Sequence, residues 1–575
     1  MQIARRLAHA LVLVLTLVIG ASAAAIIVSQ TAWFKNWIRA YIVREASLYL
    51  NGTLTIDRLA GNLLFGLEME NIGVTMDGRQ VVAVKDIGLD YNIWDFITKG
   101  LSVDNIRLDK PTIYLRREGD TWTLSRLIKQ QQWEADRRGP ARPISIEDIG
   151  ISDGSFVIDD PVGTSGVEVP KRFDHVDAKL AFKYEPVHYS IEISHVSFRG
   201  SEPAIELNAL SGGVAVREDT VYLEKLAIRT AETSLSVDGA VQQYLTRPVY
   251  NLHISSDKLS VQELARLLPA LAGVRIQPQF DVKIAGAADR LGVELNVVAS
   301  AGQLSTKLVA DVQSPVRSVT GEVSVRHLDL APVLNDPRQK SDITADARLD
   351  VRGESLSDAR SWRGTVQFDA PRVAAAGYEA ERLHGVARLE GRHVAVDARG
   401  TAYGASATAH GRVALPQGRE AIAFDLQGRA QHVDLRRLPR GIDVPRAATD
   451  VNADYHVVSN VAQAFRPADA GLTPPATSWR VDLRFDPSTI AGARIAKGGT
   501  AAVTLGKDPV EYKADATVEN LDLQTFGEQF DIPALANARF KSTLNGHVTA
   551  SGRGATAEDL DVTANGSLTD NFLNP

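Results

Sequence analysis

The sequence predicts a mainly β protein, in which an N-terminal transmembrane helix precedes an elongated antiparallel β-groove of repeating units with a few short helices. Three observations predict this class. An almost continuously apolar run extends from Leu7 to Val28. The residues that follow alternate between apolar and polar side chains with a period of about two, which is typical of strands. Phrases of this alternation also recur along the chain, which indicates a repeat architecture.

The run from Leu7 to Val28 comprises 22 residues. At a helical rise of about 1.5 Å per residue, it is long enough to cross a bilayer core of about 30 Å. Arg5 and Arg6 precede it, and the positive-inside tendency places such residues in the cytoplasm. We therefore predict a cytoplasmic start and membrane anchor over residues 1–32, with the remainder of the chain exported.

A cleaved secretory signal is the alternative to an anchor, because Ala21-Ser22-Ala23 resembles a cleavage site. Two features favour the anchor. The apolar stretch continues to Val28, and the aromatic residues Trp33, Phe34 and Trp37 follow where interfacial aromatics belong in membrane proteins.

The sequence predicts three helices beyond the anchor. Residues Trp33 to Leu50 form an amphipathic pattern, expected to lie on the membrane surface or to cap the next domain. A short helix is expected from Ser125 to Arg137. Another is expected from Ser260 to Leu271, where Ser260 and Glu263 have the spacing of a capping box. Residues between the first two of these helices have strand patterns. We therefore predict that residues 33–143 form a juxtamembrane helix and an N-terminal β domain.

One strand-like phrase occurs twice. Residues 361–369 read Ser-Trp-Arg-Gly-Thr-Val-Gln-Phe-Asp, and residues 478–486 read Ser-Trp-Arg-Val-Asp-Leu-Arg-Phe-Asp. Trp, a small or aliphatic residue and Phe share one parity in both copies, while polar residues share the other. Since successive side chains of a strand point to opposite faces, each copy predicts one apolar and one polar face.

A second phrase, built on Leu-Asp-Leu or Val-Asp-Leu, occurs at residues 327–330, 432–435 and 520–523, with a looser relative at 258–261. Each copy ends a strand-like run and leads into a short apolar segment or turn. The irregular spacing indicates a diverged array whose repeats bury their apolar faces by stacking on neighbours.

An antiparallel sheet with one apolar face needs a cover for that face. Helical patterns are scarce after residue 144, so two covers remain open: a second sheet, in a row of separate sandwiches or barrels, or an apolar ligand in one long trough. The trough interpretation makes residues 144–575 a repetitive β-groove body. Its candidate lining residues, expected to contact lipid, have the apolar parity: Val282, Ile284, Trp362, Val366, Phe368, Trp479, Val481, Leu483 and Phe485. Trp362 and Trp479 fit an ordinary core equally well.

The composition argues against several functions. The chain has no cysteine, which excludes disulfides, thiol redox chemistry and thiolate metal sites. Its formal charge of −7, without a long basic block, argues against nucleic acid as a partner. Zinc-protease, nucleophile-elbow and phosphate-loop motifs are absent from the sequence. We therefore predict no enzyme activity, no cofactor and no metal.

Two groups of residues could still suggest a reaction centre. His175, His188 and His195 are close in sequence, but solvated strand positions explain them. Asp159 and Asp160 could act as an acid and a base, yet they precede Pro161 and are better explained as the end of a strand at a solvated turn.

The stretch from Leu50 to Leu127 resembles the N-terminal domain of the AsmA-like/TamB family of envelope proteins. The residues that carry the resemblance are Gly52 to Leu64, Leu101 to Pro111 and Gly119 to Leu124. The later strand segments match the family by rhythm. The resemblance implies an inner-membrane anchor with the bulk of the chain in the periplasm, a β-taco body, and phospholipid transport toward the outer membrane.

The resemblance also implies an alternative role, a scaffold or translocation factor for outer-membrane protein assembly with an outer-membrane barrel partner. TamB-type chains usually run longer and end in a docking domain, so this chain is expected to be either a fragment or a shorter AsmA relative. We expect phospholipid acyl chains as its first partners. An enzyme or receptor is the third class, for which the residues offer little.

Overall fold

The structure of the chain is a computed structural model. It describes residues 2–62, 66–91, 101–118, 121–127, 129, 144–159, 167–185, 188–354, 359–375, 377–415, 423–439, 444–459, 479–505, 510–533, 535–554, 561–569 and 572–573. The chain divides into two compact units, Met1–Ala287 (unit 1) and Ala288–Pro575 (unit 2). Both are dominated by antiparallel strands, so the predicted mainly β class is confirmed, together with an N-terminal apolar helix and a few short helices.

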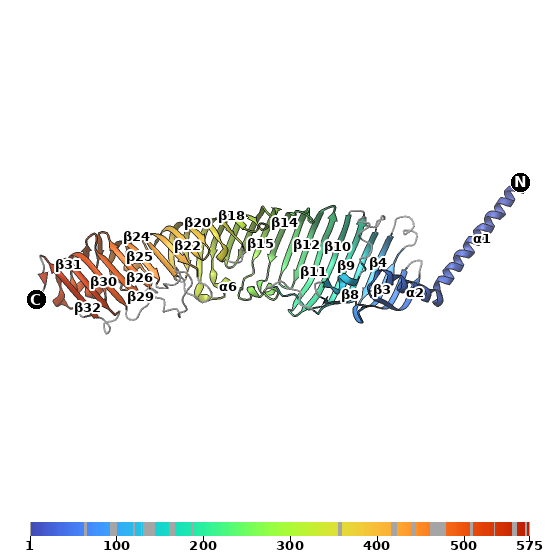
Figure 1. Cartoon of the computed structure of the whole chain (residues 1–575), viewed down its shortest axis with the longest axis horizontal. Helices are drawn as coiled ribbons and strands as arrows, with labels where there is room; N and C mark the ends of the chain where they lie inside the picture. Colours follow the sequence, from blue (N-terminus) through green and yellow to red (C-terminus); the bar gives the residue numbers. More distant parts are fainter. Residues whose placement is uncertain are drawn as a thin grey trace. The chain divides into compact units, whose positions relative to one another are not determined.

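Two helices begin unit 1 (Figure 1). Helix α1 spans Gln2–Gln30, and its segment Val12–Gln30 is long and apolar enough to cross a membrane. Helix α2 spans Ala32–Tyr49, which confirms the predicted amphipathic helix. It begins at Thr31, whose hydroxyl accepts a hydrogen bond from the amide of Phe34 and so satisfies one of the free N–H groups of the first turn.

The strands of unit 1 form a sheet in which most neighbours in the chain pair antiparallel. Its strands are β1 (Thr53–Asn62), β2 (Gly66–Met76), β3 (Arg79–Asp90), β4 (Leu101–Asp109), β5 (Thr112–Leu115), β8 (Ile144–Ile158), β9 (Arg172–Glu185), β10 (His188–Ser201), β11 (Ile205–Arg217), β12 (Thr220–Thr230), β13 (Ser234–Gln242), β14 (Val249–Lys258) and β15 (Gln279–Ala287). β4 and β5 both pair with β3 and, in parallel, with β8. A parallel pair needs a crossover connection, which the chain makes between β5 and β8.

Unit 2 continues the antiparallel pattern, which Figure 1 shows from β18 in yellow to β32 in red; most neighbours in the chain pair with each other, whereas β26 pairs with β29. Its strands are β16 (Leu291–Ala299), β17 (Gly302–Asp311), β18 (Arg317–Leu328), β19 (Ser341–Gly353), β20 (Arg363–Ala375), β21 (Tyr378–Glu390), β22 (His393–Ala402), β23 (Ala405–Ala414), β24 (Ala423–Val433), β25 (Thr449–Ser459), β26 (Trp479–Phe485), β27 (Ser488–Ile490), β28 (Ala493–Ile495), β29 (Thr500–Leu505), β30 (Glu511–Leu521), β31 (Ser542–Arg553), β32 (Asp561–Leu568) and β33 (Phe572–Leu573).

The two other predicted helices fare differently. α4 spans only Thr123–Leu127, and most of the expected range up to Arg137 lies outside the described residues. The helix expected from Ser260 to Leu271 is divided into α5 (Val261–Leu264) and the 3₁₀ turn η1 (Pro269–Leu271). Pro269 explains the division, because proline lacks an amide hydrogen and disfavours helical geometry at the preceding residue.

The capping prediction at Ser260 is half right. The Ser260 hydroxyl accepts from the amide of Glu263, as an N-cap does. The Glu263 carboxylate does not return to Ser260; it accepts hydrogen bonds from the hydroxyls of Thr230 and Thr233 on the neighbouring connection. Tertiary contacts therefore replaced the second half of the capping box.

The recurring Leu-Asp-Leu phrases form one repeated turn. Asp329, Asp434 and Asp522 each cap a short helix: α6 (Leu330–Leu334), η4 (Leu435–Arg437) and α7 (Leu523–Gln529). The residue two positions before each aspartate has a left-handed backbone, with φ of 51°, 59° and 57°. The three phrases are therefore true structural repeats, which the sequence spacing alone could not establish.

A serine or threonine at the start of the next strand closes each of these turns. Ser341 donates to the carbonyl of Leu328 and accepts from the amide of Leu330. Thr449 and Ser542 make the same pair of bonds in the other two copies. These bonds join the end of one strand to the start of its neighbour and so fix their register.

We expect the cap at Asp434 to be pH-dependent. Hydrogen bonds from the guanidinium and the amide of Arg436 lower the pKa of Asp434 to about 2. A depressed folded-state pKa stabilises the fold fully above the unfolded pKa of about 3.9 and loses that effect as pH falls toward 2. Asp434→Ala should therefore lower the free energy of unfolding by about 1 kcal/mol at pH 7, and by less at pH 2.

Urea unfolding followed by circular dichroism at pH 7, 4 and 2 measures this difference. Asp434→Asn is the control, because it keeps a capping oxygen but does not titrate. It should be about as stable as the wild type at pH 2 and less stable than the wild type at higher pH. An Ala variant that loses the same stability at pH 2 and pH 7 would contradict the assignment.

Gly364 lies inside β20 with φ of +145°, a backbone conformation that residues with a Cβ rarely adopt. A Cβ at this position would stand 2.0 Å from the carbonyl oxygen of Asp350 on β19. Gly364→Ala should therefore lower the free energy of unfolding by about 2–4 kcal/mol. Gly377→Ala is the matched control, since Gly377 also has positive φ (+84°) but an added Cβ there would meet no other atom within 4 Å. This variant should lower the free energy of unfolding by about 1 kcal/mol. Equal losses in the two variants would show that the close approach of β19 to β20 is unimportant.

Candidate functional site

The candidate site is the apolar face of the sheet, defined in unit 2 by two rows of directly paired residues. Each row crosses the strands from β16 to β32, and each residue is the cross-strand partner of the next. The first row is Val293, Leu308, Gly321, Leu349, Val366, Ala387, Val396, Gly411, Leu426, Val457, Val481, Val503, Tyr512, Gly552 and Val562. The second row is Leu295, Thr306, Val323, Ala347, Phe368, Gly385, Ala398, Ala409, Gly428, Tyr455, Leu483, Ala501, Ala514, Ala550 and Ala564.

Neither row contains a charged residue. Strands lie about 4.8 Å apart, so each row runs for on the order of 65 Å across the sheet of unit 2. The residues between the rows point to the opposite face and are strongly polar: Glu294, Lys307, Glu322 and Arg348 are paired in succession and alternate in charge. Cross-strand pairing therefore collects the apolar parity of every strand into one charge-free surface.

Five predicted lining residues lie on this face. Val366 and Phe368 are half-buried, whereas Gln367 and Asp369 between and after them are exposed. Val481 and Leu483 occupy the corresponding rows on β26, and Phe485 follows them. Phe485 is only 8% exposed and belongs to a core cluster with Ala453, Ile495 and Val518, so it is part of the core rather than of an open surface.

The two tryptophans of the repeated phrase differ. Trp479 begins β26 with 45% of its surface exposed, and its ring meets Phe424 edge-on at 5.7 Å. Trp362 is half-buried just before β20, and its carbonyl accepts a hydrogen bond from Gly391. The two copies of the phrase therefore share a tryptophan in sequence, but the two tryptophans have different surroundings in the structure.

Val282 and Ile284 lie in unit 1, on β15. They pair with Ile254 and Leu252 of β14 and are less exposed than Lys283 between them. Unit 1 therefore has an apolar face of its own, built by the same alternation.

At the start of unit 1, helices cover part of this apolar surface. Ile42 and Val43 of α2 pack on Ile56, Ile72 and Val84, and Leu127 of α4 packs on Val74 and its neighbours. In unit 2, most residues of the two rows are half-buried, and those on β32 are exposed.

Large side chains on the apolar face lie across glycines of adjacent strands. The ring of Phe368 lies over Gly385, where an added Cβ would come within 2.6 Å of it. Tyr455 lies over Gly428, and its hydroxyl donates to the carbonyl of Thr408 at 2.9 Å. Burial raises the pKa of the Tyr455 hydroxyl. Tyr455 was not among the residues predicted from the sequence to line this face. Two signals were visible there: Tyr455 has the apolar parity of its strand, and Gly428 lies in the preceding strand.

The opposite, polar face is crossed by polar side-chain contacts between neighbouring strands. Eight of the twelve histidines pair with an aspartate, as His384 does with Asp369 at 2.7 Å. These groups are exposed, and exposed pairs contribute at most about 1 kcal/mol each. They keep this face wet and hold the strands in register.

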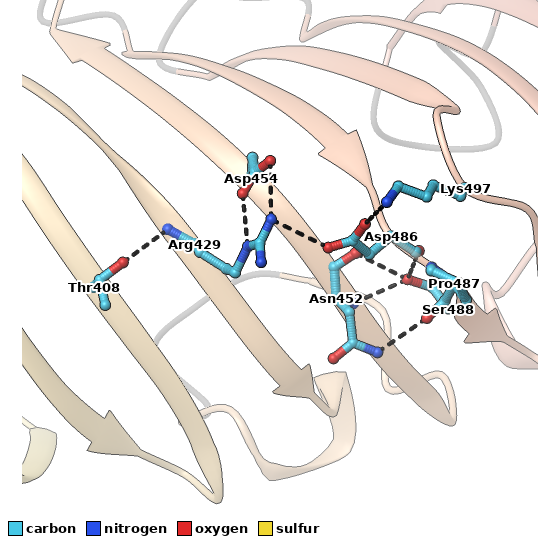
Figure 2. Close-up of polar contacts among 8 residues, drawn as sticks. All are labelled: Thr408, Arg429, Asn452, Asp454, Asp486, Pro487, Ser488 and Lys497. Atoms are coloured by element: carbon cyan, nitrogen blue, oxygen red, sulfur yellow. Dashed lines mark hydrogen bonds and ion pairs between the residues drawn. The ribbon is translucent and has the colours of Figure 1, made fainter.

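Figure 2 shows one of these networks, at the interruption between β26 and β27. The guanidinium of Arg429 donates to Asp454 at 2.8 Å and reaches Asp486 at 3.4 Å, while Lys497 approaches Asp486 at 3.7 Å. The hydrogen bond with Arg429 lowers the pKa of Asp454 and raises that of Arg429. Ser488 meanwhile accepts from the amide of Asn452 and so joins β25 to β27. All these charges are partnered, which suits a structural role.

A depression of about 910 Å³ in unit 2 is lined mainly by side chains of the polar parity, and Phe368 is the one predicted lining residue that borders it. Its walls include Lys307, Arg348, Asp369, His384 and Asp397. Charged walls do not suit acyl chains, so this depression is not the predicted groove.

The other candidate reaction residues lie at exposed positions. His175, His188 and His195 are solvated strand positions, as predicted. Asp159 follows the end of β8 and pairs with Arg116, while Asp160 lies outside the described residues. No three His, Asp or Glu side chains gather to hold a metal ion in the described part of the chain.

Comparison with known proteins adds no relative. No family model, no curated protein and no solved structure matches this chain. The resemblance to the AsmA-like/TamB family therefore stays a prediction from the sequence.

Proposed function

We propose that this protein is a membrane-anchored carrier that moves phospholipid between membranes along its apolar face. One observation carries the proposal: the two charge-free rows that cross unit 2 from β16 to β32, whose residues are half-buried or exposed. A soluble domain rarely exposes so large an apolar surface unless it binds something apolar.

The chemistry of the face suits acyl chains better than a ligand with fixed polar groups. Each buried methylene of an acyl chain contributes about 0.8 kcal/mol, so a chain lying along the rows gains several kcal/mol without any hydrogen bond. Valine, alanine, leucine and glycine follow one another without a charge that would hold a lipid at one point. Such a surface permits movement along its length, with direction set by partners or by the lipid gradient.

Helix α1 suggests where this carrier works. An N-terminal anchor with Arg5 and Arg6 before it favours a cytoplasmic N-terminus and an exported body. Together with the resemblance to AsmA-like proteins, this supports an inner-membrane protein whose bulk is periplasmic and whose lipid travels toward the outer membrane.

A scaffold for outer-membrane protein assembly is the second candidate. The resemblance to AsmA-like/TamB proteins supports it, because it also implies a role in outer-membrane protein assembly with a barrel partner. Loss of co-purification with a barrel after deletion of residues 490–575 would favour this role.

Photocrosslinking tests the carrier function. A photoreactive amino acid at Val366, on the apolar face, should form adducts with phospholipid in cells, whereas the same residue at exposed Gln367, its neighbour on the polar face, should not. Val366→Asp should abolish capture from a crosslinker at Leu349, its cross-strand partner, because a buried carboxylate repels acyl chains. Gln367→Asp is the matched control. A folded protein that captures no lipid from either position contradicts the proposal.

Retention of the anchor is tested by the mass of the mature protein. We expect an intact N-terminus and membrane extraction by detergent but not by alkaline carbonate, because α1 remains in the bilayer. Cleavage after Ala23 would instead give a product that begins at Ala24 and is released by carbonate. That result would leave the apolar face without a fixed membrane end.

A further inference from the structure

The exposed side of helix α2 carries an aromatic stripe, defined as Trp33, Trp37, Tyr41 and Leu48. These residues are separated by four, four and seven positions, so they lie on one side of the helix. Their exposed fractions are 72%, 53%, 46% and 61%. The rings are ordered against one another: Trp37 stacks on Tyr41 with centroids 6.0 Å apart, and Phe34 stacks on Trp37 at 5.6 Å.

The other side of α2 is already occupied by the sheet. Ile42 and Val43 pack on the cluster of Ile56, Ile72 and Val84. Arg39 on the same side donates to the backbone carbonyl of Asp57 in β1. The helix therefore cannot turn its aromatic stripe onto the sheet without breaking this contact.

We propose that the aromatic stripe lies in the interface of the membrane that α1 enters, so that α2 holds the start of the apolar face at the bilayer surface. The inference rests on the proposed membrane anchoring and adds where the sheet meets the lipid. Continuity of the chain identifies the occupant: α1 ends at Gln30 and α2 begins at Ala32, which leaves a single residue between the two helices.

The chemistry of the stripe fits an interface rather than the hydrocarbon core. Tryptophan and tyrosine concentrate at the headgroup level, where one part of the ring is apolar and another can hydrogen-bond. Arg44 stands beside the stripe, with its guanidinium 5.6 Å from the centre of the Tyr41 ring. A cation there can reach a lipid phosphate while its stem stays in apolar surroundings.

This placement has a consequence for the carrier. α2 separates the membrane from the cluster of Ile56, Ile72 and Val84, where the apolar face of unit 1 begins. A lipid that leaves the bilayer next to the stripe meets that face within the width of one helix, about 10 Å. The side chains of α2 therefore form both the membrane contact and the lid of the first strands.

Spin labels test the proposal in the full-length protein reconstituted in nanodiscs of phosphatidylethanolamine and phosphatidylglycerol. The chain has no cysteine, so each label position is unique. Leu48→Cys reports on the stripe and keeps all its aromatic rings. Asn36→Cys is the matched control, exposed on another side of the same helix, and Leu17→Cys reports on α1. Collisions with oxygen, which partitions into lipid, are compared with collisions with a water-soluble nickel complex.

The label at position 48 should collide more with oxygen than with nickel, as the label at position 17 does, and the label at position 36 should show the reverse. Replacing Trp33, Trp37 and Tyr41 by serine should lose the lipid signal at position 48 and keep it at position 17. A label at position 48 as exposed to nickel as that at position 36 overturns the proposal. Spin–spin broadening between labels at position 48, lost on dilution with unlabelled protein, also overturns it, in favour of a second copy as the occupant. Lipid capture at Val366 is measured separately, so either proposal can fail alone.

Discussion

The register of the antiparallel strands is the constraint on which the rest of this structure depends. Side chains alternate with a period of two, so a slip of one residue in any strand would move its apolar residues to the wet face and its charges to the apolar face. The charge-free rows of unit 2 exist only because every pairing from β16 to β32 keeps the same parity. Local interactions at the ends and in the middle of strands keep the apolar residues of each strand on the same face.

Two kinds of device recur. At strand ends, the aspartate-capped turns at Asp329, Asp434 and Asp522 tie one strand to the next through a serine or threonine. Within strands, glycines such as Gly364 permit a conformation and an approach of the neighbouring backbone that a Cβ would prevent. Large side chains then cover some of these glycines, as Phe368 covers Gly385. Ion pairs on the wet face add a further penalty for a slip, because a shifted register would separate opposite charges such as Lys307 and Glu322.

An apolar face held this rigidly is a hazard unless it is occupied, since exposed apolar surface promotes association. The chain covers its first strands with α2 and α4 and leaves the rows of unit 2 half-covered. A ligand that is itself apolar would complete the cover that antiparallel sheets normally receive from helices or a second sheet. The proposed carrier function and the stability of the fold thus depend on the same half-covered face.

Part of this could be predicted from the sequence. Local periodicity specified the class, the helix Ala32–Tyr49 and the apolar parity of Val366, Phe368, Val481 and Leu483. Rules of local geometry failed where distant residues intervened: the carboxylate of Glu263 bonded Thr230 and Thr233 instead of completing a capping box, and Phe485 entered a core cluster with β28 and β30. Tyr455 was overlooked because its role depends on Gly428 and Thr408, which only strand pairing brings to it.

The sequence by itself determined the apolar run of α1, the strand alternation and the absence of cysteine, because these depend on the order and type of residues alone. It did not decide between separate closed cores and a single uncovered face, since both need the same alternating strands. Within unit 2, strand pairing favours the single face, because it places the apolar residues of the two rows opposite one another across one sheet. The direction of the Trp33–Trp37–Tyr41 stripe was likewise a tertiary matter, because it depends on which side of α2 packs on β1 and its neighbours.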